Sequence, residues 1–311
     1  MSVREFDEAE LSHVVALWNQ CLPMDMLNEA IFRERILLDE NFDRGLLLCA
    51  EENGRIIGFG YGMKRKAAYY TKGLEPENGW ICILFVAPDC RRRGVGTQLC
   101  QDLEDRLRQK GALQIILGSY SPHYFVPGVD CTAEEAMSFF TQRGYLREKP
   151  CFSMRKILQG YQIPEEIQKK RRKMEADGFR FTGFLPKYEA GLRRFLTENF
   201  TPGWYRNVEI LLREKKGEAQ IYLCVSPEDH VIGFCMRGMD NSPNRFGPFG
   251  VAEQYRNHAL GSVLFCSVLH DYACQGIYFI YFLSTDTDGR RFYERHGMEC
   301  FREFFHMRKQ L

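Results

Sequence analysis

The feature that most constrains the fold of this chain is an internal duplication. A predicted β-hairpin, made by segments 46–49 and 56–59, is matched by a second one made by segments 221–224 and 231–234. In both hairpins a cysteine ends the first strand, and the second strand starts seven positions after it. Matched internal spacing of this kind indicates a repeated structural unit.

Further pairs of segments follow in the same order. Segment 85–96 aligns without gaps on 250–261, and in each copy an amphipathic helix then runs fifteen positions to a glycine, which we expect to cap the helix in the left-handed conformation. Each helix is followed by an apolar strand, a second helix with an aromatic pair ahead of a glycine, and a strand that is expected to close its own copy. These last pairs are 112–117 with 277–283, 139–145 with 292–298, and 152–155 with 301–307.

The repeats predict two tandem copies of one α/β fold, of the α+β kind with a mixed sheet. We place the first domain at residues 1–160 and the second at residues 179–311. Residues 161–178 between them contain a proline at a helix start and lack a core pattern, which indicates a solvated connecting helix. A chain of 311 residues is long enough for two hydrophobic cores.

Composition narrows the classes of partner. The 42 basic and 41 acidic residues nearly balance, so the chain has no overall field for nucleic acid or anionic lipid. The basic run at 169–173 is expected to be a hydrated surface, so neither a nucleic acid nor a membrane is predicted as a partner. The twelve cysteines include no Cys-x-x-Cys pair, which is typical of reduced thiols in a cytoplasmic protein. No metal site, secretory signal or membrane span is predicted, and the composition is compatible with a homo-oligomer.

The clearest functional motif lies where a strand passes into a helix, at residues 91–97. Gly94 and Gly96 let the backbone approach a ligand closely, and the N–H groups of the first helical turn form an anion site with the positive end of the helix dipole. Three arginines add charge in a geometry suited to phosphate oxygens. The predicted pyrophosphate-binding turn comprises Arg91, Arg92, Arg93, Gly94, Val95, Gly96 and Thr97.

This motif differs from two other nucleotide loops. Leu99 occupies the place of the third glycine of the dinucleotide fingerprint, and no Gly-Lys-Ser/Thr follows. The pattern Arg91-x-x-Gly94-x-Gly96 after a Val-x-Pro strand end instead resembles the acyl-CoA loop of the GNAT superfamily of N-acyltransferases. The duplication is similar in architecture to the mycothiol synthases, which are tandem members of that superfamily. The resemblance implies two GNAT folds and acetyl-CoA as cosubstrate, with Phe85 and Val86 also in contact with it.

The second copy departs from the family pattern at one position of the loop. It reads Arg256-x-x-Ala259-x-Gly261, so the methyl group of Ala259 stands where the family has a hydrogen atom. The resemblance implies that Val251, Arg256 and Gly261 are the corresponding CoA contacts, with binding that is weakened or lost.

The resemblance also implies a mechanism. In the family an acceptor amine attacks the thioester carbonyl directly, and a backbone N–H near Val86 or Val251 polarises that carbonyl. A tyrosine in the aromatic-glycine segment often protonates the departing thiolate. Tyr293 stands at this position in the second copy and is predicted to be catalytic, whereas the first copy has Phe140, which cannot donate a proton.

In the first copy the loop that follows the apolar strand, residues 118–130, is longer than its counterpart. It would border the acceptor cleft, and its candidate catalytic residues are His123 and Tyr124, with Tyr120 and Asp130 nearby. The same loop is also compatible with an aromatic lid packed on the core.

The predicted function is the transfer of an acetyl group from acetyl-CoA to the primary amine of a small molecule. One alternative is a non-catalytic acyl-CoA sensor, because Phe140 and Ala259 each remove one expected element. The other is a protein or peptide N-acetyltransferase, since no sequence feature decides the acceptor.

Overall fold

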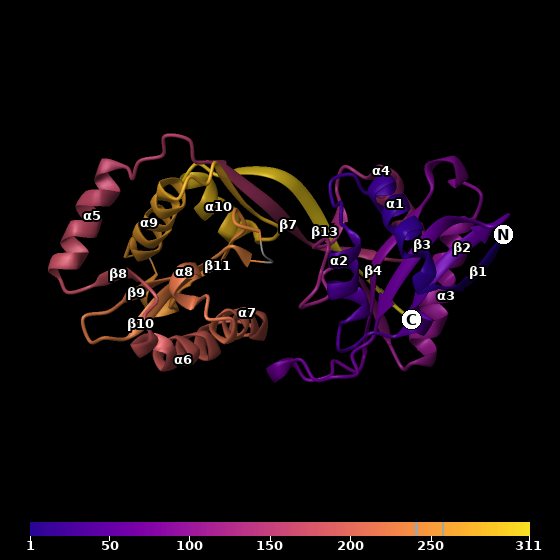
Figure 1. Cartoon of the computed structure of the whole chain (residues 1–311), viewed down its shortest axis with the longest axis horizontal. Helices are drawn as coiled ribbons and strands as arrows, with labels where there is room; N and C mark the ends of the chain where they lie inside the picture. The colour runs from indigo at the N-terminus through magenta and orange to yellow at the C-terminus, as the bar shows by residue number, and fades with distance from the viewer. Residues whose placement is uncertain (240–241, 257) are drawn as a thin grey trace. The chain divides into compact units, whose positions relative to one another are not determined.

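The computed structural model describes residues 1–239, 242–256 and 258–311, which form two compact units. The first unit comprises Met1–Cys151 and Arg302–Leu311, and the second comprises Phe152–Phe301 (Figure 1). Each unit combines strands with covering helices, so the predicted mixed α/β class is confirmed. Within the described residues, none of the helices has the combined length and hydrophobicity that crossing a bilayer requires.

The first unit is built on a mixed sheet. Strands β1 to β4 pair antiparallel in chain order, β5 runs parallel to β4, and the C-terminal part of β13 runs antiparallel to β5. The two-residue strand β6 also pairs with β13. The bounds are β1 Ser2–Glu5, β2 Leu47–Glu52, β3 Arg55–Met63, β4 Asn78–Val86, β5 Gln114–Leu117, β6 Val129–Asp130, β7 Leu146–Ile157 and β13 Glu299–Gln310.

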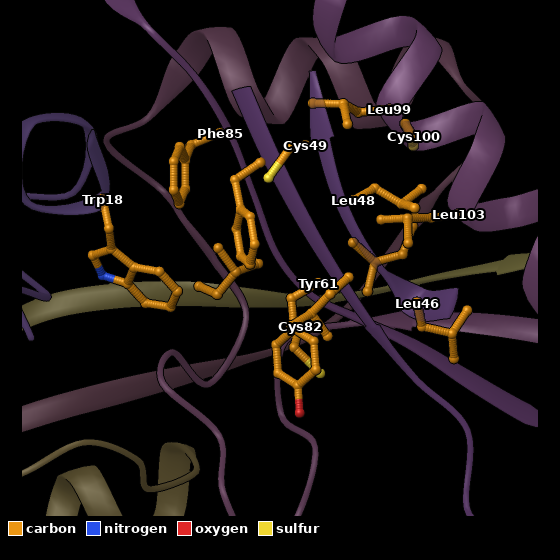
Figure 2. Packing of buried hydrophobic residues seen from close by; sticks show 14 of the residues in the cluster. Trp18, Leu46, Leu48, Cys49, Tyr61, Cys82, Phe85, Leu99, Cys100 and Leu103 are labelled. Carbon is orange, nitrogen blue, oxygen red and sulfur yellow. The ribbon is translucent and has the colours of Figure 1, made fainter. Parts of the chain in front are cut away.

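The alternation of side chains along β3 explains how helices cover both faces of this sheet (Figure 2). Phe59 faces the helix α1, where Trp18 packs against it with ring centroids 6.5 Å apart. Gly58 and its neighbour Gly60 face the helix α3, and a Cβ atom at Gly58 would lie 2.9 Å from the side chain of Leu99. The missing side chains therefore let α3 approach the sheet closely. The helices are α1 Leu11–Cys21, α2 Glu29–Phe32, α3 Val95–Gln109 and α4 Glu134–Gln142.

The second unit repeats this plan. Its antiparallel sheet has the order β11-β10-β9-β8, and β12 pairs with the C-terminal part of β7. The predicted left-handed glycine caps are confirmed in both units, at Gly111 with φ +84° and at Gly276 with φ +74°. The elements are β8 Arg180–Gly183, β9 Ile221–Val225, β10 Val231–Arg237, β11 Phe246–Val251, β12 Phe279–Phe282, α5 Glu165–Ala176, α6 Glu189–Asn199, α7 Pro202–Arg213, α8 Gly217–Gln220, α9 Leu260–Cys274 and α10 Thr287–Arg295.

The expectation that each copy closes its own sheet is wrong, because the closing strands are exchanged. β7 begins in the first unit and ends in the second, where Met154 pairs with Phe282. β13 begins in the second unit and ends in the first, where Met307 pairs with Leu117. The compact units therefore differ from the repeat boundaries predicted at residues 160 and 179.

Ion pairs fix the exchanged C-terminal strand within the first unit. Lys309 Nζ lies 2.7 Å from Oε2 of Glu104, a fully buried carboxylate on α3. Arg302 forms a bidentate pair with Asp25, at 2.7 and 2.9 Å, and its Nε donates to Asp130. Because these groups are largely buried, the ion pairs stabilise the position of β13 in addition to its backbone hydrogen bonds.

The predicted connecting helix, α5, is part of the second unit and packs on its core. Ile167 is buried in the same cluster as residues of α9, and Met174 packs against that cluster. The expectation of a helix without core contacts is therefore wrong, since two apolar side chains on one face of an otherwise charged helix are enough to dock it.

Candidate active site

The candidate site of the first unit begins where β4 and β5 separate. Their parallel pairing runs from Asn78 opposite Gln114 to Ile81 opposite Leu117, after which β5 ends and β4 continues to Val86. A register shift against β3 makes Cys82 an extra residue in β4, directly beyond the last paired residue. Such bulges bend a strand and increase its twist, which accounts for the separation.

The direction of the backbone groups at the end of β4 follows from one hydrogen bond. The Ala87 N–H donates to the Ile57 carbonyl on β3 at 2.8 Å. Because peptide groups alternate along a strand, the N–H groups of Leu84 and Val86 point away from β3, toward the side that β5 has left. The Val86 carbonyl, on the same side, accepts from Arg91 Nε at 3.3 Å and from the Cys21 thiol at 3.5 Å.

The turn between β4 and α3 has the geometry expected of an anion site. Gly94 takes φ +83°, a left-handed conformation that glycine adopts without strain, and precedes the first helical residue. The first intrahelical bond runs from the Gln98 N–H to the Gly94 carbonyl, so the N–H groups of Val95, Gly96 and Thr97 have no acceptor within the helix. No acidic residue occupies this first turn. The positive end of the helix dipole is thus exposed at the turn.

The three predicted arginines have different surroundings. Arg93 Nη2 donates to both carboxylate oxygens of Glu52, at 2.8 and 2.9 Å, which ties the turn to the end of β2. Arg91 reaches back to Val86, and its Nη1 lies 3.8 Å from Glu135 at the start of α4. Arg92 is exposed and takes a positive φ of 60°. The positive side-chain charge that can reach an anion at the turn therefore comes mainly from Arg91 and Arg92.

Phe85, a predicted CoA contact, has its side chain in the core of the first unit. Its ring is buried against Trp18, with centroids 5.7 Å apart, and its N–H points toward β3 by the same alternation. Leu84, which the sequence analysis did not select, presents its N–H on the open side instead. Leu84 stands two residues before Val86 of the Val-x-Pro strand end. Its N–H is therefore identified as facing the open side of β4 once the direction of the Val86 peptide group is known.

The described residues of the corresponding turn in the second unit make similar contacts. Ala259 takes φ +61° ahead of α9, and Arg256 Nε donates to the Val251 carbonyl at 3.4 Å. A Cβ atom on Gly261 would lie 3.6 Å from Phe292 and 3.9 Å from Val251, much as one on Gly96 would lie near Phe139 and Val86. Residue 257 of this loop lies outside the described residues. Ala259 departs from the family pattern without changing the turn.

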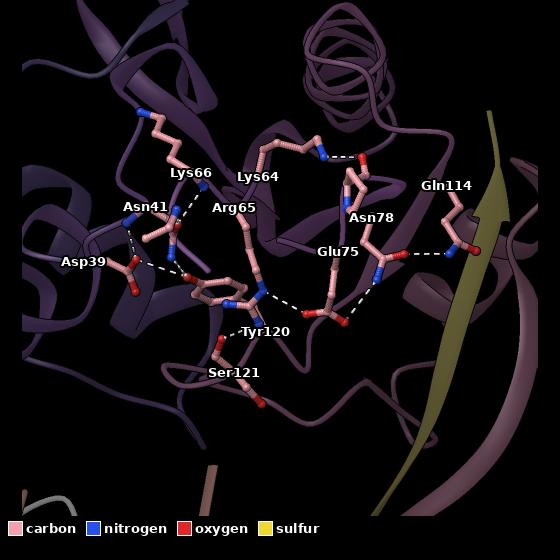
Figure 3. Close-up of polar contacts among 12 residues, drawn as sticks. Asp39, Asn41, Lys64, Arg65, Lys66, Glu75, Asn78, Gln114, Tyr120 and Ser121 are labelled. Atoms are coloured by element: carbon pink, nitrogen blue, oxygen red, sulfur yellow. Dashed lines mark hydrogen bonds and ion pairs between the residues drawn. The ribbon is translucent and has the colours of Figure 1, made fainter. Parts of the chain in front are cut away.

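His123 and the residues around it form a buried polar cluster in the first unit. His123 Nδ1 lies 2.9 Å from Asp39 Oδ2. Figure 3 shows Asp39 beside Tyr120, whose hydroxyl lies 3.1 Å from Asp39 Oδ1. The Asn41 backbone N–H donates to Asp39 at 2.8 Å, and the Asn41 side chain donates to Tyr120. The structure thus pairs one predicted residue with a carboxylate that the sequence analysis did not select.

The other candidates in the long loop have different neighbours. Asp130 accepts from Arg302 and from Thr132, which gives it a role in holding β13. Tyr124 is half-buried beside His123 in the chain. Phe125 packs on Trp18 with ring centroids 5.0 Å apart, so part of the loop does cover the core, as the lid interpretation expects.

Tyr293 lies in an aromatic cluster of the second unit. Its ring is almost fully buried, with centroids 4.7 Å from Phe282 and 5.4 Å from Phe265. Burial raises the pKa of its hydroxyl above the ordinary value. Phe140 at the matching position of the first unit is likewise buried, beside Tyr145.

A model of the acetyltransferase (GNAT) family matches residues 11–124 and again residues 189–298, which together make up more than half of the chain. The chain belongs to the GNAT family. It is therefore an acyltransferase with two GNAT domains in tandem, as its motifs predicted. GNAT enzymes use acetyl-CoA as cosubstrate together with an acceptor.

Curated GNAT relatives match part of the chain. An acetyltransferase of Pectobacterium atrosepticum is 34% identical over 121 residues, covering 38% of this chain and 74% of that protein. An acetyltransferase of Sodalis glossinidius is 33% identical over the same length and covers the same shares.

Solved structures share the complete tandem fold. The GCN5-related glucosamine N-acetyltransferase region of a fungal β-N-acetylglucosaminidase superposes with a TM-score of 0.81 at 21% identity, covering 99% of this chain and 38% of that one. A GCN5-related N-acetyltransferase of Sphaerobacter thermophilus has a TM-score of 0.74 at 18% identity, covering 99% and 95%. A tandem GNAT protein of clavulanic acid biosynthesis has a TM-score of 0.66 at 13% identity, covering 99% and 98%.

Proposed function

We propose that the first unit is an N-acetyltransferase that moves the acetyl group of acetyl-CoA to the primary amine of a small molecule. The observation that carries this proposal is the pair of N–H groups, on Leu84 and Val86, on the open side of β4 directly before the anion-binding turn of α3. Backbone N–H donors for a thioester, at the end of β4, and for a phosphate group, at the start of α3, therefore lie close together in the chain.

The two sets of N–H groups would bind different parts of acetyl-CoA. The N–H groups of Val95, Gly96 and Thr97 would hold the pyrophosphate, because they are unpaired within the helix and lie at the positive end of its dipole. The Leu84 N–H would polarise the thioester carbonyl, because a fixed donor stabilises the negative charge that develops on its oxygen during attack by the amine.

The first unit is favoured over the second for two reasons. Gly94 adopts the left-handed conformation without strain, whereas Ala259 adopts it at a cost of about 1 kcal/mol. The first unit also combines the turn with an ionisable pair, in which His123 of the long loop meets Asp39 from the segment before β2. Amino sugars are the first acceptors to test, since the structural relative with a TM-score of 0.81 is named as a glucosamine N-acetyltransferase.

Calorimetry with CoA tests this assignment. We expect one CoA per chain, and we expect Arg91→Glu and Gly94→Trp to weaken its affinity by roughly 100-fold, because they remove charge-assisted contacts or fill the turn. The matched control is Gly111→Trp at the other end of α3, where the φ of +84° and the open surroundings are the same. Arg256→Glu is the corresponding change in the second unit. Unchanged CoA affinity in both first-unit variants would contradict the assignment.

Turnover is then measured as CoA release with amino sugars, polyamines, aminoglycosides and short peptides. Acetylation of a small amine in preference to peptides supports the proposal. A non-catalytic acyl-CoA sensor is the second candidate, favoured by Phe140 in place of the family tyrosine. Saturable CoA binding without turnover on any acceptor is the result that this candidate predicts.

A further inference from the structure

The Asp39–His123 cluster has the construction of a supported base. The two side chains come from distant segments, one before β2 and one after β5, and meet at 2.9 Å. Asp39 and its neighbours Asn41 and Tyr120 are at most 6% exposed, whereas the side chain of His123 is 22% exposed. The carboxylate is therefore the inner member of the pair and the imidazole is the outer one.

Three donors keep the Asp39 carboxylate charged although it is buried. Burial alone would raise its pKa, but hydrogen bonds from His123, from the Asn41 N–H and from Tyr120 lower the pKa below the ordinary value for aspartate. A charged carboxylate at Nδ1 holds the proton of a neutral imidazole on that nitrogen. The lone pair is then on Nε2.

Arg65 and Glu75 fix the position of Tyr120 and of the start of the long loop. The guanidinium of Arg65 lies 5.0 Å from the centroid of the Tyr120 ring, and its Nη2 donates to the Ser121 carbonyl at 2.9 Å (Figure 3). Glu75 accepts from Arg65 Nε at 2.8 Å. Arg65 therefore joins the segment between β3 and β4, residues 64–77, to the long loop after β5, which holds the loop that carries His123.

The cluster lies beside the point where β4 leaves β5. The Gly118 N–H donates to the carbonyl of Ile81, the last paired residue of β4, so the long loop starts there. Tyr120 packs on Trp80 of β4 with centroids 5.5 Å apart. Burial and the nearby charge of Asp39 together raise the pKa of the Cys82 thiol at the bulge. Cys82 precedes Leu84 by two residues, roughly 7 Å along a strand.

We propose that His123 accepts, on Nε2, the proton that the acceptor ammonium must lose before it attacks, and that Asp39 is the positioning residue for His123. This inference rests on the proposed function and adds the base to it. Neither side chain is required for CoA binding.

The proton and electron balance is simple. Nε2 takes one proton from the ammonium, and the freed lone pair of the amine forms the new C–N bond at the thioester carbonyl. The C–S bond breaks with its electron pair on sulfur, and the second proton of the attacking nitrogen passes to that thiolate. The products are the amide, CoA thiol and one proton, which the imidazole releases to water.

Substitutions test the two roles separately with the full chain and the best acceptor of the panel. His123→Gln is expected to lower kcat by about 10²–10⁴-fold, the usual range for a lost general base. Asp39→Asn is expected to lower kcat within the same range, because an amide can leave the imidazole in the wrong tautomer. The KM for acetyl-CoA stays within about twofold in both variants, since neither side chain holds CoA. Imidazole in solution should restore part of the activity of a His123→Gly variant.

The matched control is Asp43→Asn. Asp43 also accepts a backbone N–H, that of Gly45, but its ion pair at 2.7 Å is with Lys110 at the end of α3. It should therefore lose stability without losing kcat. Equal losses of kcat in Asp43→Asn and Asp39→Asn would show that Asp39 acts through stability alone, which overturns its positioning role.

Nitrogen NMR of the labelled histidine side chains gives a readout that does not require an acceptor. We expect the neutral His123 ring to carry its proton on Nδ1, and Asp39→Asn to shift it toward Nε2. A neutral ring protonated on Nε2 in the unaltered protein overturns the inference, as does full kcat in His123→Gln. A protein that binds CoA but acetylates no acceptor instead overturns the proposed function, and the inference with it.

Discussion

The two strand-to-helix turns of this chain, before α3 and before α9, have a similar backbone at the residue that precedes each helix, although that residue is Gly94 in one and Ala259 in the other. Gly94 takes φ +83° and Ala259 takes φ +61°, and each precedes a helix of the same length. The packing of the flanking strand and helix determines the backbone conformation of the turn. The residue before the helix determines only how much strain energy that left-handed conformation carries. Loss of the family glycine is thus weak evidence for loss of the family geometry.

The helices that follow these turns differ more deeply. Position 104 of α3 holds a buried glutamate that pairs with Lys309 at 2.7 Å, while the equivalent position of α9 holds Leu269, which is equally buried. The lysine that corresponds to Lys309 is Lys156, which donates to the Gly297 carbonyl at 3.0 Å. The first unit thus holds its exchanged strand through an ion pair, where the second uses apolar packing.

The largest effect is expected from breaking that ion pair. Lys309→Met removes the closer cation of the buried Glu104 carboxylate and leaves Arg143 at 4.0 Å, which should cost up to about 3–5 kcal/mol of local stability. Hydrogen exchange of the α3 amides measures the loss. Lys156→Met in the second unit removes a hydrogen bond to a carbonyl and a cation–π contact with Tyr161, and should cost about 1–2 kcal/mol.

The double variant Glu104→Leu with Lys309→Met replaces the ion pair by two apolar side chains, with leucine at position 104 as at Leu269 of the second unit, and separates the two explanations. It should recover most of the stability, because an apolar pair of similar volume avoids the desolvation cost of a charged one. A double variant as unstable as Lys309→Met alone would mean that the first unit requires the ion pair itself.

Exchanging the residues at the apex of the turns should have a moderate effect of opposite sign in the two units. Gly94→Ala forces an alanine to φ +83° and should cost about 1 kcal/mol. Ala259→Gly relieves the same strain and should stabilise the second unit by under about 1 kcal/mol, since the greater freedom of unfolded glycine offsets part of the gain. Chemical denaturation followed by hydrogen exchange in α3 and α9 reports each unit, and effects of the same sign would refute the comparison.

The smallest effect is expected at the family tyrosine. Tyr293→Phe makes the second unit match Phe140 of the first, and the ring keeps its aromatic neighbours, so stability should change by less than about 1 kcal/mol. If catalysis belongs to the first unit, kcat should change by less than about twofold. Steady-state kinetics decides this point, and a large loss of kcat would transfer the chemistry to the second unit.

Much of the fold could be predicted because the duplication fixes element order twice. Alternating strands, glycine caps and the turn at Gly94 all follow from local sequence, and both caps lie where the spacing put them. The exchange of the closing strands could not be predicted. Segments 152–155 and 301–307 carry the same strand pattern, and no local signal states which of two similar sheets a strand will join.

The candidate site was predictable only in part, for a similar reason. The anion-binding turn is a contiguous segment, so its residues are visible in the sequence. Asp39 lies 84 positions from His123 and belongs to an unremarkable acidic stretch, so only the folded chain brings the two together. The ion pair of Arg93 with Glu52 likewise depends on a hairpin remote in sequence.

The exchanged strand has a consequence for the order of synthesis. Domains usually fold as they leave the ribosome, N-terminal domain first. Here the sheet of the first unit requires residues 302–311, the end of the described chain, before β5 gains its antiparallel neighbour. The sheet of the N-terminal unit therefore stays incomplete at its β5 edge until the whole second unit has been translated.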